Sequence, residues 1–239
     1  MCTVSWLHED GGYQLLCNRD EKLTRKPARG PRLEDREGVR VLLPRDLDAG
    51  GSWLGVNEAG LTLCLLNGPP AGSVPTRSRG LLIPELLSAP DCAAVDRRLR
   101  DVNLRAFAPW VLLALEPGQP AYVAEWNGRE LAANWGGEAL IPLVSSSVDS
   151  DGVRSMRRRE FARRKAQAGA ITPAMLFAFH SSHGTRASAY SSCMHRPDAE
   201  TVSFSWVRVN PAEIQFSYWP QAPCQWVPGE RQRLERKAA

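Results

Sequence analysis

Short stretches of alternating apolar and polar residues recur along the chain, a pattern typical of β-strands with one buried face. Residues 3–7 and 13–17 form the first such pair, and an Asp-Gly-Gly turn at 10–12 between them favours a hairpin. Asn127-Gly128 is the strongest hairpin turn in the sequence. Further strands are predicted at 53–56, 61–66, 110–115, 122–126, 130–134, 201–209 and 214–219.

Helical patterns separate these groups of strands. Residues 78–89, 91–101 and 154–168 are predicted to be helical, and Ser88 and Asp91 are suited to a helix start. Thr172-Pro173 predicts another helix, with Thr as its cap and Pro at its first position. The stretch 22–49 is rich in Arg, Pro and Asp and is interpreted as a loop.

The resulting order is two hairpins, a helix pair, strands, another helix pair and strands, which predicts an α+β domain of layered sheets and helices. No linker divides the chain, so residues 1–228 are expected to form one domain. Residues 229–239 are expected to form a charged, flexible tail.

Composition and charge exclude some classes of function. The chain has 239 residues, 43% of them hydrophobic, and a net charge of +4. The basic run at 154–165 is interpreted as a solvated helix face, so nucleic acid is not expected as a partner. A secretory signal is not expected, and no apolar run approaches membrane-spanning length. The six cysteines form no C-x-x-C pair. A cytoplasmic protein with reduced thiols is therefore expected.

Cys2 is the first candidate for chemistry. Removal of Met1 would leave Cys2 with both a thiol and a free α-amine. An α-amine has a pKa near ~8, so it can act as the base that activates its own side chain. The alternative is that position 2 is merely a permissive terminus.

A run of polar residues, Asn18-Arg19-Asp20-Glu21, ends the second predicted strand. If the first two strands pair through the turn at 10–12, this run lies opposite the start of the chain. Arg19 would then favour the Cys2 thiolate, and Asp20 would orient the amine. A surface salt bridge at a strand end is the alternative.

Asn67 follows the predicted strand at 61–66 and precedes Gly68-Pro69. Its amide and the neighbouring backbone N–H groups could stabilise an oxyanion. An ordinary hairpin that ends in a turn is the alternative.

Together, Met1-Cys2, Asn18-Arg19-Asp20-Glu21 and Gly51-Ser52-Trp53-Leu54-Gly55 resemble the NRDE family, also called the transport-and-Golgi-organisation protein 2 family. Gly184-Thr185-Arg186, ahead of a predicted strand, fits as well, which adds Arg186 to the candidate site. The resemblance extends from residue 1 to about 210 and is most specific in the first seventy residues.

This family resembles the N-terminal-nucleophile hydrolases, especially the conjugated-bile-salt and penicillin V acylases. The resemblance implies a four-layer αββα sandwich with Cys2 as nucleophile, Asp20 holding the amine, and Asn67 at the oxyanion hole. Two departures exist. Arg19 directly precedes Asp20, unlike the arginine of the acylases, and Ser146 stands where those relatives have a second oxyanion-binding Asn.

The histidines and a cysteine between 180 and 195 form a further group, comprising His180, His183, Cys193 and His195. A solvated loop is favoured over a zinc site, because no acidic third ligand has a suitable spacing. Some relatives are implicated in haem handling, and this group or Cys2 could supply axial ligands.

The expected activity is hydrolysis of a non-peptide amide of a small molecule through Cys2, with no cofactor. The alternative is a non-enzymatic protein on the same scaffold that binds or carries haem or another hydrophobic small molecule.

Overall fold

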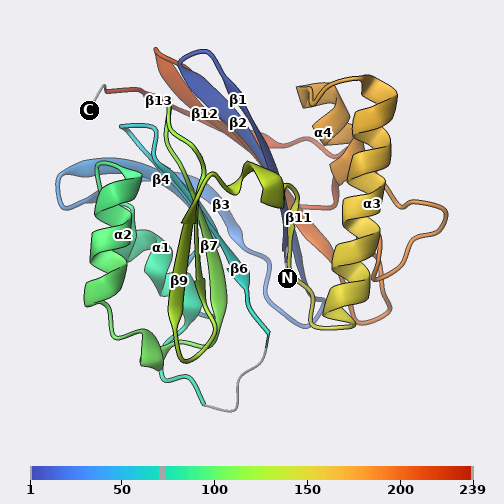
Figure 1. Ribbon diagram of the computed structural model, residues 1–239, viewed down its shortest axis with the longest axis horizontal. Helices are drawn as coiled ribbons and strands as arrows, with labels where there is room; N and C mark the ends of the chain where they lie inside the picture. The colour runs from blue at the N-terminus through green and yellow to red at the C-terminus, as the bar shows by residue number, and fades with distance from the viewer. Residues whose placement is uncertain (1, 70–73, 238–239) are drawn as a thin grey trace.

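Two antiparallel β-sheets stack face to face, and helices cover both outer faces (Figure 1). The computed structural model describes residues 2–69 and 74–237. Within these residues one sheet has six strands in the order β10-β1-β2-β11-β12-β13, and the other has seven in the order β3-β4-β5-β6-β7-β8-β9. The fold is an α+β sandwich with helix, sheet, sheet and helix layers, as the sequence predicts.

The first sheet contains β1 (Cys2–Glu9), β2 (Gly12–Lys22), β10 (Leu143–Val144), β11 (Ala199–Val209), β12 (Glu213–Trp219) and β13 (Glu230–Glu235). The second contains β3 (Arg29–Arg36), β4 (Val39–Arg45), β5 (Leu54–Asn57), β6 (Thr62–Asn67), β7 (Trp110–Leu115), β8 (Tyr122–Trp126) and β9 (Leu131–Trp135). The helices are α1 (Leu82–Leu86), α2 (Cys92–Asp101), α3 (Ser150–Ala168) and α4 (Pro173–His180).

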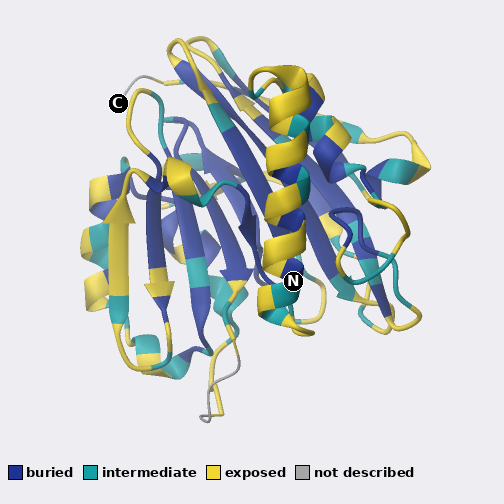
Figure 2. Ribbon diagram, turned by 45° about the vertical axis from the view of Figure 1, so that its right-hand side comes forward, coloured by how far each residue is buried: buried dark blue, intermediate teal, exposed yellow. Residues whose placement is uncertain are grey.

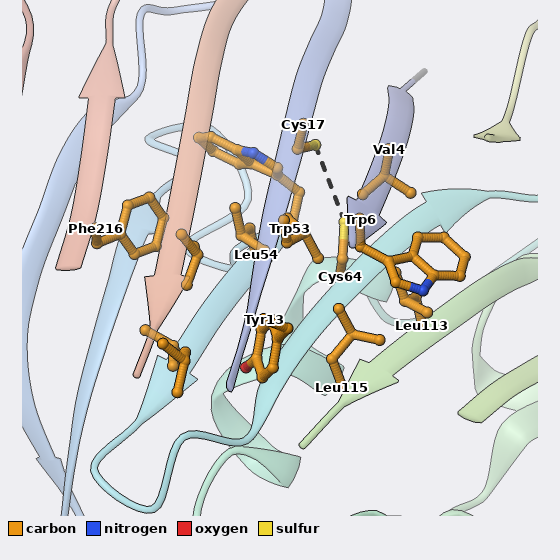
Figure 3. Packing of buried hydrophobic residues seen from close by; sticks show 14 of the residues in the cluster. Val4, Trp6, Tyr13, Cys17, Trp53, Leu54, Cys64, Leu113, Leu115 and Phe216 are labelled. Atoms are coloured by element: carbon orange, nitrogen blue, oxygen red, sulfur yellow. Dashed lines mark hydrogen bonds between the residues drawn. The ribbon is translucent and has the colours of Figure 1, made fainter. Parts of the chain in front are cut away.

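Alternation along β1 and β2 determines which side chains enter the space between the sheets. Val4, Trp6 and Cys17 point into this space and pack against the second sheet (Figure 3). The sulfur of Cys17 lies 4.0 Å from that of Cys64 on β6. The intervening residues of β1 and β2 face α3 and α4, so both strands are buried on both faces.

The helices bury one face each against a sheet. α1 and α2 pack on the seven-stranded sheet, and α3 and α4 pack on β2 and β11. The outward face of α3 is exposed along its length (Figure 2). The Asp91 carboxylate accepts a hydrogen bond from the N–H of Ala94, and Thr172 caps α4 through the N–H of Met175, so both predicted helix starts are confirmed. None of the described helices has the length and apolarity needed to cross a bilayer.

Two predictions from the polar pattern are wrong. The stretch 22–49 contains β3 and β4 rather than a loop throughout. β3 is an edge strand with mostly exposed, charged side chains, which is why its pattern suggested a loop. Residues 230–235 form β13, paired along its length with β12, so this part of the chain is not a flexible tail.

Candidate active site

Cys2 begins β1 and is almost fully buried, with 5% of its surface exposed. It pairs with Arg19 of β2, so the two strands bring the predicted residues together. The backbone N–H of Cys2 donates to the Ser145 hydroxyl at 3.0 Å, and the N–H of Ser145 donates to the Cys2 carbonyl at 2.9 Å. Ser145 directly follows β10, and these two bonds fix the nitrogen of the candidate nucleophile.

A pocket of about 150 Å³ opens beside Cys2. Gly51 allows its segment to lie close to the backbone of Gly80 on the other side of the pocket, because a Cβ at Gly51 would lie 2.4 Å from the backbone carbonyl carbon of Gly80. The pocket is lined by charged and polar residues from β2, β6, a short 3₁₀-helix and the loops near them: Arg19, Glu21, Arg25, Asp46, Ser52, Asn67, Ser78 and Arg79, with Trp53 and Leu65 among the apolar ones.

Arg19 is held in this pocket by two contacts. Its guanidinium lies 2.8 Å from the Asp46 carboxylate, and its central carbon lies 4.3 Å from the centre of the Trp53 ring. Arg25 shares the same carboxylate at 2.8 Å. Although burial opposes it, backbone N–H groups and the two arginines lower the pKa of Asp46. Asp46 therefore stays ionised and fixes the arginine that faces Cys2.

The thiol of Cys2 is not a ready-made thiolate. Its side-chain hydrogen bond with Cys17 and its burial raise the pKa of Cys2 well above the usual value. The guanidinium of Arg19 is ion-paired with Asp46, so Arg19 offers Cys2 less than a full positive charge. A neighbouring base is needed to remove the proton from Cys2.

We expect Cys17→Ala to make Cys2 ionise more easily, because the substitution removes the hydrogen bond that raises its pKa. The pH dependence of iodoacetamide alkylation at Cys2, followed by peptide mapping, should shift to lower pH. Cys92→Ala, a buried thiol in α2, is the matched control and should leave the profile unchanged. An unchanged or higher midpoint in Cys17→Ala would contradict this account.

Asp20 projects from the opposite face of β2 and is fully buried. Its carboxylate lies 3.0 Å from the guanidinium of Arg157 on α3 and accepts a 2.7 Å hydrogen bond from the Thr201 hydroxyl. Arg157 also donates to the Thr3 hydroxyl and to the carbonyl of Ala189. Asp20 is thus neither a surface charge nor the partner of Arg19.

Arg157 corrects the interpretation of the basic run at 154–165. Only 1% of its surface is exposed, whereas Arg154, Arg158 and Arg159 face solvent as predicted. A helix that packs on a sheet buries one stripe of side chains, and Arg157 occupies that stripe with Val153 and Phe161. The sequence pattern did not reveal its acidic partner, which is 137 positions away.

The remaining predicted residues fall in three places. Asn18 is buried toward α4, where its amide donates to the carbonyls of His180 and Ser192, so its role is structural. Asn67 lines the Cys2 pocket, and its side chain makes no hydrogen bond within the described residues. The N–H of Gly68, predicted to be available, donates to the Pro109 carbonyl. Arg186 is exposed in a separate hollow and does not line the Cys2 pocket.

Ser146, predicted as the second oxyanion donor, bonds with its hydroxyl to the carbonyl of Val148. It lies with Asn67 in an adjoining pocket of about 180 Å³, whereas its neighbour Ser145 contacts Cys2. The resemblance therefore indicated Ser146, whereas the residue that holds Cys2 is its neighbour Ser145.

The first 138 residues match the family model described as "Transport and Golgi organisation 2". That match covers more than half of the chain and includes Cys2, Arg19 and every residue that lines the Cys2 pocket. The chain belongs to this family. No curated protein sequence matches the chain.

Solved structures show which fold this family member has. Penicillin V acylase from Agrobacterium tumefaciens superimposes with a TM-score of 0.61 at 12% identity, covering 98% of this chain and 86% of that chain. A mutant conjugated bile acid hydrolase from Clostridium perfringens gives a TM-score of 0.58 at 11% identity, covering 98% of this chain and 92% of that chain. The N-acylethanolamine-hydrolyzing acid amidase orthologue of Caenorhabditis elegans gives a TM-score of 0.58 at 12% identity, covering 86% of this chain and 92% of that chain. The family member thus has the N-terminal-nucleophile hydrolase fold.

Arg79 is a pocket residue that the sequence analysis missed. Burial lowers its pKa, and its guanidinium donates to the Pro109 carbonyl at 2.8 Å. Within the described residues it forms no ion pair, unlike Arg19 and Arg25. It begins a short 3₁₀-helix that the sequence pattern merged into one longer helix, so no local signal marked it.

His180 is separate from the other histidines of its predicted group. It is fully buried, and its Nε2 lies 2.8 Å from the Ser5 hydroxyl on β1. Burial, with a smaller contribution from the positive Arg157, lowers the pKa of His180 to about 3. His183, Cys193 and His195 gather elsewhere, with Cys224 as a fourth member.

Acid should destabilise the fold through His180. Its folded pKa of about 3 lies below the unfolded value of about 6.5, so the unfolded chain binds more protons between these values. The contribution of His180 to the free energy of unfolding is fully present above about pH 6.5. It is lost as the pH falls toward 3, by at most about 1.4 kcal/mol per pH unit. Urea unfolding at pH 7, 5 and 4 should show a shallower loss in His180→Gln than in wild type. His8→Gln, on the exposed end of β1, is the control, and equal slopes in all three proteins would refute the assignment.

Proposed function

We propose that this family member is a cysteine amidohydrolase that cleaves non-peptide amides, with Cys2 as nucleophile after removal of Met1. The observation that carries this proposal is the position of Cys2. It begins a central strand, its nitrogen is held by Ser145, and it faces a pocket with Arg19, Arg79 and Asn67. The six free cysteines of the chain fit a cytoplasmic setting in which thiols stay reduced.

The α-amine of Cys2 supplies the base that the raised pKa of the thiol requires. The amine takes the thiol proton as the sulfur attacks the carbonyl carbon of the amide. The side-chain amide of Asn67, which makes no hydrogen bond among the described residues, donates to the oxyanion that forms. The protonated amine then gives its proton to the leaving nitrogen, which departs and leaves a thioester on Cys2. Water, deprotonated by the same amine, attacks the thioester and releases the acid and the thiol.

The charges in the pocket favour a substrate with an anionic group near the scissile amide. Arg79 has a half-buried cation whose only hydrogen-bond partner among the described residues is a carbonyl. A substrate carboxylate would complete its coordination in a geometry that guanidinium groups favour. The volume of about 150 Å³ accommodates a small acyl group.

The alternative function, haem carriage, receives less support from this pocket. Its volume is about half the lower end of the range for drug-sized ligands, roughly 300 Å³. The buried Cys2 thiol, whose pKa is raised, also lacks the thiolate character of a haem ligand. We therefore place amide hydrolysis first.

A panel of small N-acyl compounds, with and without a carboxylate, tests the proposal. The panel should include activated amides and esters. Intact mass first establishes that Met1 is removed, and a mass increase on Cys2 during turnover then reports the thioester. Titration of the same preparation with hemin tests the alternative function, haem carriage. No hydrolysis by the trimmed protein, together with stoichiometric haem binding, would reject the hydrolase proposal.

A further inference from the structure

A second group of reactive side chains lies outside the candidate active site. His183, Cys193, His195 and Cys224 each direct one ligand atom to a common point, and these atoms all lie within 4.8 Å of one another. Three of the residues come from the segment between α4 and β11, and Cys224 comes from the short 3₁₀-helix Pro223–Gln225 after β12. None of them lines the Cys2 pocket.

The distances match those of a tetrahedral metal site. The Nε2 of His195 lies 3.6 Å from the sulfur of Cys193 and 3.4 Å from the sulfur of Cys224. Zinc bonds of ~2.3 Å to sulfur and ~2.05 Å to nitrogen at tetrahedral angles give a nitrogen–sulfur separation of about 3.6 Å. Both nitrogen–sulfur distances are therefore close to those of a zinc tetrahedron, and the other distances among the four ligand atoms are at most 4.8 Å.

The surroundings of both histidines are those of metal ligands. The other ring nitrogen of His195, Nδ1, lies 3.5 Å from the carboxylate of Glu200, and zinc-bound histidines commonly have such a partner. The Nε2 of His183 is buried and has no hydrogen-bond partner among the described residues, and the ring centre of His183 lies 5.1 Å from that of His195. A metal ion would give this nitrogen the partner that it lacks.

We propose that these four side chains form a structural Zn²⁺ site. Two thiolates and two imidazoles are ligands that zinc prefers, and four protein ligands leave no open position for a substrate. Binding converts both cysteine thiols to thiolates, so two protons are released for each Zn²⁺ bound. No change of oxidation state is involved.

The site would tie together segments that the strands leave unconnected. It would join the 3₁₀-helix after β12 to the loop before β11. Residues beside Cys193 in that loop already support β2 and β11, since the Ser192 carbonyl accepts from Asn18 of β2 and the Met194 N–H donates to Thr201 of β11. Thr201 in turn holds Asp20. Loss of the metal should therefore lower thermal stability and loosen the buried pair of Asp20 and Arg157.

Zinc titration of the reduced, metal-free, full-length protein tests the proposal. We expect one Zn²⁺ per chain, with a Kd below about 10⁻⁷ M measured against a chromophoric chelator. Co²⁺ in place of Zn²⁺ should give tetrahedral d–d absorption and a thiolate charge-transfer band. Cys224→Ser and His195→Gln should each weaken zinc binding more than about 100-fold, and Glu200→Gln about 10-fold to 100-fold. Cys92→Ser, a buried thiol outside the group, should bind zinc as the wild type does.

Two results would overturn the proposal. One is a wild-type protein that binds no zinc under reducing conditions, including the case in which Cys193 and Cys224 persist as a disulfide despite the reductant. The other is zinc binding that survives unchanged in Cys224→Ser and His195→Gln. If Cys193→Ser does not fold, zinc binding by the variants Cys224→Ser and Glu200→Gln still tests the proposal, because Cys224 is only half-buried and Glu200 is not itself a ligand. Alkylation of Cys224 in the presence and absence of zinc gives an independent measure, because a bound thiolate should be protected.

Discussion

Cys2→Ala is expected to reduce amide turnover by at least about 10⁴-fold while the protein stays folded and still binds its ligand. The sulfur forms the bond to the acyl carbon, so no other group in the pocket can replace it. Cys2 lies at the end of the inter-sheet core, and a methyl group still occupies part of its volume. Initial rates on the best amide of the panel and equilibrium binding of the same amide give the two readouts.

Two controls distinguish loss of the nucleophile from loss of the fold. Cys92→Ala removes a thiol that is equally buried in the opposite helix layer and should retain full turnover. An N-terminal extension that is not removed leaves Cys2 and its thiol in place but converts the α-amine into an amide. That protein should fold and should also lose turnover, because the base is gone. Turnover that persists in Cys2→Ala would show that the activity does not use Cys2.

The largest expected effect on stability comes from Arg157. We expect Arg157→Met to lower the free energy of unfolding by about 3–5 kcal/mol, because it removes the buried guanidinium that contacts the Asp20 carboxylate. Both side chains are almost completely buried, at 1% and 0% exposure, so water cannot take over the lost contact. Urea unfolding at pH 7 measures the change.

Arg158→Met is the matched control, since the same change is made one position along α3 on an exposed side chain. It should alter the unfolding free energy by no more than about 0.5 kcal/mol. Asp20→Asn should destabilise the protein as Arg157→Met does, and the double variant should lose less than the sum of the two single changes. Additive losses, or a loss in Arg157→Met no larger than in Arg158→Met, would show that the pair does not act as a unit.

Asp20→Asn therefore needs a stability measurement before its activity is interpreted. From the sequence, Asp20 is expected to orient the amine of Cys2 together with Arg19. In the structure, Arg19 and Asp20 leave β2 on opposite faces and have different partners, Asp46 and Arg157. A loss of activity in Asp20→Asn has to be compared with a variant of equal stability.

Local pattern was sufficient for the framework of the fold. The alternation at 3–7 and 13–17 with a turn between them determined the first hairpin, and this hairpin brings Cys2 opposite Arg19. The caps at Asp91 and Thr172 determined two helix starts. These predictions succeed because the responsible contacts lie within a few residues along the chain.

Contacts between distant segments decided the chemistry of the site. Asp46 neutralises Arg19 across 27 positions, Ser145 holds the nitrogen of Cys2 across 143, and Asp20 pairs with Arg157 across 137. Cys224 lies beside His195 across 29 positions, which is why the ligands of the proposed zinc site did not form a recognisable spacing. A sequence determines which residues can bear a charge or a thiol. Only the packing of sheets and helices determines which of them are desolvated and which partner each one meets, and these two factors set their pKa values and their reactivity.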